Sequence, residues 1–167
     1  MNNINDLKDK IGDADVVLVG VGEEFFLSEN SETDVSSAYE NLASVLEGKN
    51  YFIVSLCNDD LIYSSGLKID KIAAPFSPNE SNNEDEGKGQ WDKYMMWLSC
   101  TLNKKLLVLE LGVGLNAPHV IRWPFEKTVM LNNKAELIRI NETLPNLPTE
   151  IKDKGLGIKL NSVDFCL

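Results

Sequence analysis

Runs of residues that are apolar at every position alternate along this chain with stretches that are apolar at every third or fourth position. A short uninterrupted apolar run predicts a strand covered on both faces, as in a parallel sheet, whereas the wider spacing predicts an amphipathic helix. The runs predict strands at 16–20, 51–55, 106–111 and 136–140, and shorter strands at 71–74, 128–131 and 155–160. The helical spacing predicts helices at 2–12, 35–46, 90–102 and 118–127, and helical turns at 60–65 and 147–152. This alternation predicts a three-layer α/β fold, with a doubly wound (Rossmann-like), mostly parallel sheet and helices on both faces.

One polar segment interrupts the alternation. Residues 77–89 are rich in acidic and amide side chains and are bracketed by Pro and Gly, a composition that predicts a flexible acidic loop. A chain of 167 residues is long enough to bury its own core. We therefore expect a single domain over 1–167 that contains this loop.

The charge balance and the cysteines narrow the classes of function. The 26 Asp and Glu residues exceed the 16 Lys and Arg residues, and the formal net charge of −10 disfavours binding to nucleic acid or anionic membranes. Cys57, Cys100 and Cys166 lie far apart without a C-x-x-C pair, so we expect no structural zinc site. No apolar run approaches the ~20 residues of a membrane span, and the N-terminus is polar. These features favour a cytoplasmic protein with reduced thiols.

The first candidate site is the Gly-x-Gly turn at Gly20 and Gly22, which follows the first predicted strand as a phosphate-binding loop would. The third glycine of a dinucleotide fingerprint is replaced by Phe25, and Glu23 and Glu24 stand where a phosphate would lie. Backbone N–H groups at such a turn attract anions. The loop is therefore either a tight turn whose donors these carboxylates satisfy, or a phosphate loop whose glutamates point into solvent.

A second glycine loop follows the strand at 106–111. Gly112 and Gly114 allow close backbone approach, and Asn116 offers amide donors and an acceptor. Ligands of open α/β sheets bind at the carboxyl ends of the strands, near the point where the strand order reverses. This loop is the better candidate for an anion or nucleotide site, and a plain structural turn is the alternative.

Two polar residues mark the end of the strand at 136–140. Asn141 either hydrogen-bonds a ribose hydroxyl or caps a turn. Arg139 alternates with isoleucines and is expected to pair with a nearby acid or with a phosphate.

These motifs occur in the order of a known family. Gly20-Val-Gly22, then 51–59, then Leu-Gly-Val-Gly-Leu-Asn116, then Leu-Ile-Arg-Ile-Asn141 resembles the sirtuins, which are NAD-dependent protein deacetylases. The stretch from Glu110 to Glu126 looks like a bacterial sirtuin-like branch. The resemblance implies a sirtuin large-domain-like fold that holds NAD or ADP-ribose, with contacts from Gly20, Gly22, Gly112, Gly114, Asn116 and Asn141.

The chain departs from the family at the catalytic and metal positions. Cys57 stands at an asparagine position of the second family motif, whereas Asp59 is kept. Residues 74–78 lack the family's general-base histidine, and the single histidine, His119, lies beside the second glycine loop. The zinc-binding cysteines are missing too. The resemblance therefore implies a divergent, shortened sirtuin without a zinc domain.

Three functions fit these observations. The first is an NAD or ADP-ribose binding protein that is impaired in catalysis. The second is an active NAD-dependent protein deacylase or ADP-ribosyltransferase that uses Asp59 in place of the missing base, since a carboxylate stabilises an oxocarbenium-like cation. The third is an interaction module with a closed pocket, whose aromatic helix at 90–102 binds a protein partner or a second copy of the chain.

Overall fold

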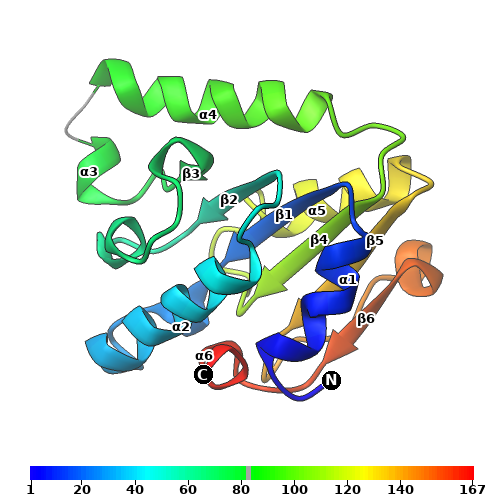
Figure 1. Cartoon of the computed structure of the whole chain (residues 1–167), viewed down its shortest axis with the longest axis horizontal. Helices are drawn as coiled ribbons and strands as arrows, with labels where there is room; N and C mark the ends of the chain where they lie inside the picture. The colour runs from blue at the N-terminus through cyan, green and yellow to red at the C-terminus, as the bar shows by residue number, and fades with distance from the viewer. Residues whose placement is uncertain (82–83) are drawn as a thin grey trace.

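Six strands form one sheet in the computed structural model, which describes residues 1–81 and 84–167 (Figure 1). The strands are β1 (Val16–Val21), β2 (Tyr51–Ser55), β3 (Ile72–Ala73), β4 (Leu106–Leu111), β5 (Ala135–Ile140) and β6 (Gly155–Ile158). All neighbouring pairs are parallel, and the order across the sheet is β3-β2-β1-β4-β5-β6. The winding therefore reverses between β1 and β4, which confirms the predicted doubly wound sheet.

Helices cover both faces of this sheet. The α-helices are α1 (Lys8–Asp13), α2 (Glu32–Val45), α3 (Pro78–Ser81), α4 (Glu84–Ser99), α5 (Arg122–Leu131) and α6 (Ser162–Cys166). The 3-10 helices are η1 (Ile4–Leu7), η2 (Glu23–Phe25), η3 (Leu61–Ser64), η4 (Ile69–Lys71) and η5 (Thr149–Lys154). Figure 1 shows α1 and α2 in front of the sheet and α5 behind it, while α4 lies beside β3. No helix in the described part of the chain is long and apolar enough to cross a membrane.

The two covered faces explain why the strands are apolar at every position. Val17 and Val19 of β1 face the core beneath α1, α2 and α6, whereas Val16 and Leu18 face the core beneath α4 and α5. Successive side chains of a strand point to opposite faces, so a strand between two layers of helices buries all of them. All six residues of β1 are buried accordingly.

The strand predicted at 128–131 is wrong, because these residues form the second half of α5. Val129 is buried one turn after Phe125, whereas the neighbouring Met130 and Leu131 are exposed, which is a helical pattern. Pro124 lies in the first turn of α5, where its missing N–H removes no helical hydrogen bond. The hydroxyl of Thr128 donates to the Pro124 carbonyl at 2.8 Å and keeps this threonine within the helix.

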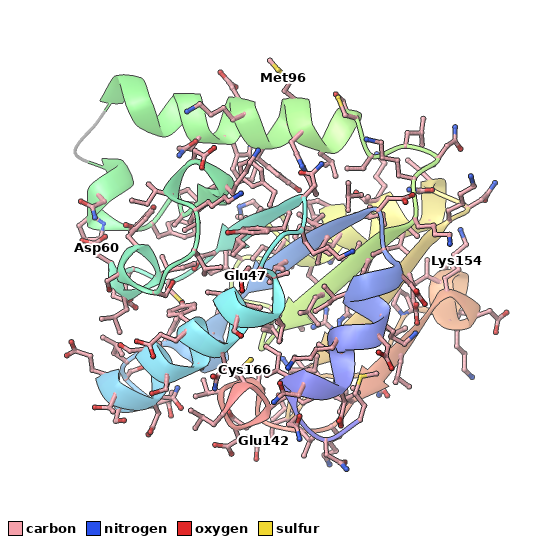
Figure 2. All side chains as sticks on the ribbon, viewed as in Figure 1. Glu47, Asp60, Met96, Glu142, Lys154 and Cys166 are labelled. Atoms are coloured by element: carbon pink, nitrogen blue, oxygen red, sulfur yellow. The ribbon has the colours of Figure 1, made fainter. Side chains whose placement is uncertain are left out.

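The loop predicted at 77–89 is largely helical where the structure describes it, with a bend at Ser77 before α3. The Ser77 hydroxyl donates to Asp60 Oδ1 at 2.6 Å and accepts from the Asn79 N–H at 3.3 Å, an arrangement that starts α3. Figure 2 labels Asp60 beside this helix. Helix α4 begins at Glu84, six residues before the predicted start at Gln90. Residues 82 and 83 lie outside the described part of the chain, and the flexibility of this segment stays a prediction.

Candidate functional site

The candidate site lies at the carboxyl ends of β1 and β4, where the strand order reverses. The loop after β1 and the loop after β4 touch there, and the Gly22 N–H donates to the Leu111 carbonyl at 2.9 Å. A Cβ added at Gly22 would lie only 2.6 Å from the Gly112 carbonyl oxygen. Glycine is therefore required at position 22 by loop–loop packing, whatever ligand the crevice holds.

The carboxylate of Glu23 crosses from the first loop to the second. It accepts from the Gly114 N–H at 2.6 Å and from the Asn116 N–H at 3.0 Å. One of the two alternatives for the first loop was a tight turn whose own backbone donors these carboxylates satisfy. Glu23 does satisfy two backbone donors. The donors belong to the second glycine loop, however, and not to the turn that carries the glutamate.

Glu24 makes a second bridge in another direction. One carboxylate oxygen accepts from the Glu142 N–H and the other from the Ser162 N–H, both at 2.7 Å. Glu142 follows β5, and Ser162 is the first residue of α6. Figure 2 labels Glu142 and Cys166, the last residue of α6. Gly112, whose φ is +65°, leaves room for the Glu24 side chain, since an added Cβ would overlap it. Glu24 therefore ties the first loop to the far half of the sheet.

The Val113–Gly114 peptide is held in one orientation. Its carbonyl accepts from Arg122 Nη1 at 2.8 Å and from Asn141 Nδ2 at 3.2 Å. In a planar trans peptide the C=O and N–H point in opposite directions, so this pair of donors aims the Gly114 N–H at Glu23. Arg122 had no predicted role, although an arginine one residue after the buried Ile121 was a usable signal.

Asn141 also shapes the turn after β5. Its Oδ1 accepts from the Thr143 N–H at 2.9 Å and from the Leu144 N–H at 2.7 Å, and the residue is buried. These bonds are those of a capping residue. Asn141 thus contacts the second glycine loop from behind, through Val113.

Arg139 pairs with acids, which were one of the two kinds of partner expected from the sequence. It donates to both oxygens of Glu110, at 2.6 and 3.2 Å, and to Glu126 at 2.7 Å. Its fourth bond goes to the Asn146 carbonyl at 2.8 Å. Arg139 and Glu110 are fully buried, so this guanidinium is committed to the protein interior.

A pocket of about 300 Å³ opens beside Glu23. Its lining comes from the ends of β1, β2 and β4 and from the segment after β3: Glu23, Phe26, Leu56, Asn58, Phe76, Asn116 and Ala117. Glu23 is the single ionisable side chain among these described lining residues. The pocket is therefore mainly apolar, with two amides and one carboxylate at its wall.

Three glycines and Asp59 were also predicted as site residues, and they are not part of the pocket lining. Gly112 and Gly114 flank Glu24 and Glu23 in the crevice, whereas Gly20 lies within β1 and faces Ile121 and Phe125 of the α5 layer. Asp59 does not line the pocket.

Asp59 is half-buried and follows the buried Cys57 on the α2 side of the sheet. One oxygen of Asp59 accepts from the Leu61 N–H at 3.0 Å, and the other is buried with no partner in the part of the chain that the structure describes. Burial raises the pKa of Asp59 above its ordinary value. Burial also raises the pKa of the Cys57 thiol to about 11, and the Tyr39 hydroxyl lies 3.4 Å from its sulfur. A thiol of this pKa is a poor nucleophile.

Two other expectations concern histidine and metal. His119 is exposed in the turn before α5 and is not part of the pocket lining. Within residues 1–81 and 84–167, no three His, Cys, Asp or Glu side chains gather where they would hold a metal ion.

Comparison with known proteins finds relatives that are named as ADP-ribosyltransferases, and no family model matches the chain. A probable bifunctional ADP-ribose hydrolase/ADP-ribosyltransferase of Fusarium oxysporum f. sp. cubense is 43% identical over 78 residues, 43% of this chain and 12% of that protein. A protein ADP-ribosyltransferase of Staphylococcus aureus is 21% identical over 187 aligned positions, 93% of this chain and 59% of that protein. The chain therefore spans less than two thirds of either relative. Neither name is that of a sirtuin, so membership of that family stays a prediction.

Proposed function

We propose that this chain binds NAD or ADP-ribose in the crevice between β1 and β4. The observation that carries the proposal is the contact of Glu23 with the N–H groups of Gly114 and Asn116. Two backbone donors that converge on one carboxylate form an anion site, which is the chemistry that a nucleotide phosphate requires. The names of the two relatives support an NAD- or ADP-ribose-related function.

The adjoining pocket suits the base and ribose of such a ligand. Phe26, Leu56 and Phe76 offer apolar surface to a ring, while the amides of Asn58 and Asn116 offer hydrogen bonds. A volume of about 300 Å³ lies at the lower end of the range for small-molecule sites. The pocket therefore suits one nucleoside half, with the phosphates reaching the donors at Gly114 and Asn116.

Binding without turnover is the form of the proposal that the pocket chemistry supports. Among the described lining residues, Glu23 is the single ionisable side chain, and in the free protein both of its oxygens accept hydrogen bonds. His119 lies on the surface outside this lining. In this arrangement the described lining residues provide no general base that is free to abstract a proton.

An ADP-ribosyltransferase or deacylase is the second candidate, and both relatives are named as ADP-ribosyltransferases. In this function Asp59 would stabilise the cationic transition state. Its side chain would have to turn toward the crevice, since Asn58 rather than Asp59 lines the pocket.

Titration calorimetry with ADP-ribose and with NAD tests the proposal. We expect saturable heat with one ligand per chain and no release of nicotinamide, which chromatography of the NAD mixture measures. Absence of heat at millimolar ligand would contradict binding, and release of nicotinamide would establish the second candidate.

A matched pair of variants tests whether the ligand lies in the pocket. Phe76 and Ile69 are both exposed, but only Phe76 lines the pocket. Phe76→Ala should weaken binding about tenfold, because removing an aromatic stacking partner costs about 1–3 kcal/mol per base. Ile69→Ala should leave the affinity unchanged, and equal effects of the two substitutions would place the ligand elsewhere.

A further inference from the structure

The Glu23 carboxylate occupies the two N–H donors that a nucleotide phosphate would use under the proposed function, on which this inference rests. We propose that Glu23 is an internal competitor for phosphate: it closes the anion site in the free protein and must leave before a phosphate-bearing ligand binds. Phosphate and carboxylate cannot share these donors, because both are anions and would lie within hydrogen-bonding distance of the same two hydrogens.

The anion site does not depend on Glu23 for its shape. Arg122 and Asn141 hold the Val113 carbonyl from behind, at 2.8 and 3.2 Å, and this fixes the direction of the Gly114 N–H. Arg122 is itself buried and donates through Nη2 to the Leu144 carbonyl at 3.2 Å. The Gly114 N–H therefore stays aimed into the crevice when the carboxylate moves away.

Glu23 is placed to move, whereas Glu24 is not. Glu23 is only partly buried, so its side chain can turn toward solvent when the ligand fills the pocket. Its carboxylate accepts hydrogen bonds, in the described structure, from the N–H groups of Gly114 and Asn116 alone. Glu24 accepts from the N–H groups of Glu142 and Ser162, so its departure would remove the two hydrogen bonds that link the first loop to the residue after β5 and to α6. The two adjacent acids thus have different roles.

The competition makes a specific demand on the ligand. A neutral ligand such as adenosine can enter the pocket while Glu23 stays on its donors. ADP-ribose must displace the carboxylate, so its affinity in the native protein is reduced by the fraction of molecules in which the donors are accessible. Inorganic pyrophosphate carries only the competing group and reports on the anion site without any contribution from the pocket.

The decisive experiment compares Glu23→Ala with Glu29→Ala, which removes an exposed carboxylate from the same segment and controls for net charge. Backbone amide NMR signals of Gly114 and Asn116 are followed during titration with pyrophosphate, and circular dichroism checks the fold. We expect both signals to respond in Glu23→Ala, with pyrophosphate at least tenfold tighter than in the native chain or in Glu29→Ala, as for one charge-assisted bond. Glu23→Gln, of the same size and neutral, serves if the alanine variant does not fold.

The outcomes separate this inference from the proposed function. Unresponsive Gly114 and Asn116 signals in a folded Glu23 variant, or an equal gain in Glu29→Ala, would overturn the competitor role. Pyrophosphate binding to Glu23→Ala without ADP-ribose binding to either protein would support the competitor and contradict the proposed function. Equal affinity of ADP-ribose for the native chain and for Glu23→Ala would support the function and overturn the competitor.

Discussion

Replacing Glu24 by alanine should destabilise the protein, because this carboxylate joins three separate segments of the chain. It accepts from the Glu142 N–H and from the Ser162 N–H, both at 2.7 Å, and alanine offers neither donor an acceptor. The Cβ that packs against Gly112 is retained in alanine, so the substitution removes the hydrogen bonds and little of the packing.

The expected loss follows from these two bonds. Hydrogen bonds to a charged group contribute about 1.5–3 kcal/mol each. The Glu142 N–H is near solvent, and water will replace the carboxylate there in part. We therefore expect the free energy of unfolding to fall by about 2–3 kcal/mol for the pair. For a chain of this length each kcal/mol lowers Tm by about 2–4 °C, so Tm should fall by about 4–12 °C.

Urea unfolding followed by tryptophan fluorescence and by far-UV circular dichroism measures this difference by linear extrapolation. Glu24→Gln keeps one acceptor and should lie between the native chain and Glu24→Ala, while Glu29→Ala, at an exposed site, should match the native chain. A loss below about 0.5 kcal/mol in Glu24→Ala, the usual effect of a neutral surface substitution, would refute the bridging role of this carboxylate.

Three further predictions concern the Arg139–Glu110 ion pair, the cysteines and Asp59. Arg139→Met should cost about 3–5 kcal/mol in urea unfolding, because it leaves the buried Glu110 carboxylate without its guanidinium, and adding Glu110→Leu should restore much of the loss; an unchanged midpoint in the single variant would contradict this. Only the exposed Cys100 should react rapidly with a disulfide reagent in the native protein, since Cys57 is buried with a pKa of about 11; three rapid equivalents by mass spectrometry would show an open core. Burial raises the folded-state pKa of Asp59, so ionisation of this carboxyl lowers the stability of the protein as pH rises from the unfolded-state pKa through the folded-state pKa. Asp59→Asn should therefore raise Tm at pH 7 by more than at pH 4. An equal rise in Tm at both pH values would contradict this sign.

Strand positions could be predicted because a strand between two helical layers buries every side chain, which makes its consecutive residues apolar. The prediction at 51–55 coincides with β2 and that at 106–111 with β4. The same signal failed at 128–131, since Val129 is buried while Met130 and Leu131 lie on the surface of a helix. Three consecutive apolar residues carry no period that separates a strand from the exposed edge of a helix.

Local sequence also placed each glycine loop at the carboxyl end of a strand, because each loop directly follows an apolar run. The structure added that these two strands, β1 and β4, are neighbours in the sheet. Local sequence could not assign Arg122, whose partners are the carbonyls of Val113 and Leu144. Which carbonyls a buried arginine reaches depends on how α5 packs against both loops, and no spacing along the chain contains that information.

The sequence by itself determined a doubly wound parallel sheet with two acids in the first glycine loop. Only the tertiary structure decided what those acids do. Glu23 contacts N–H groups 91 and 93 residues away, and Glu24 contacts groups 118 and 138 residues away. Charge and turn geometry are local properties that a sequence displays directly. The identity of the donor that satisfies a carboxylate is set by which strand ends are neighbours in the sheet, and that is settled only when the chain folds.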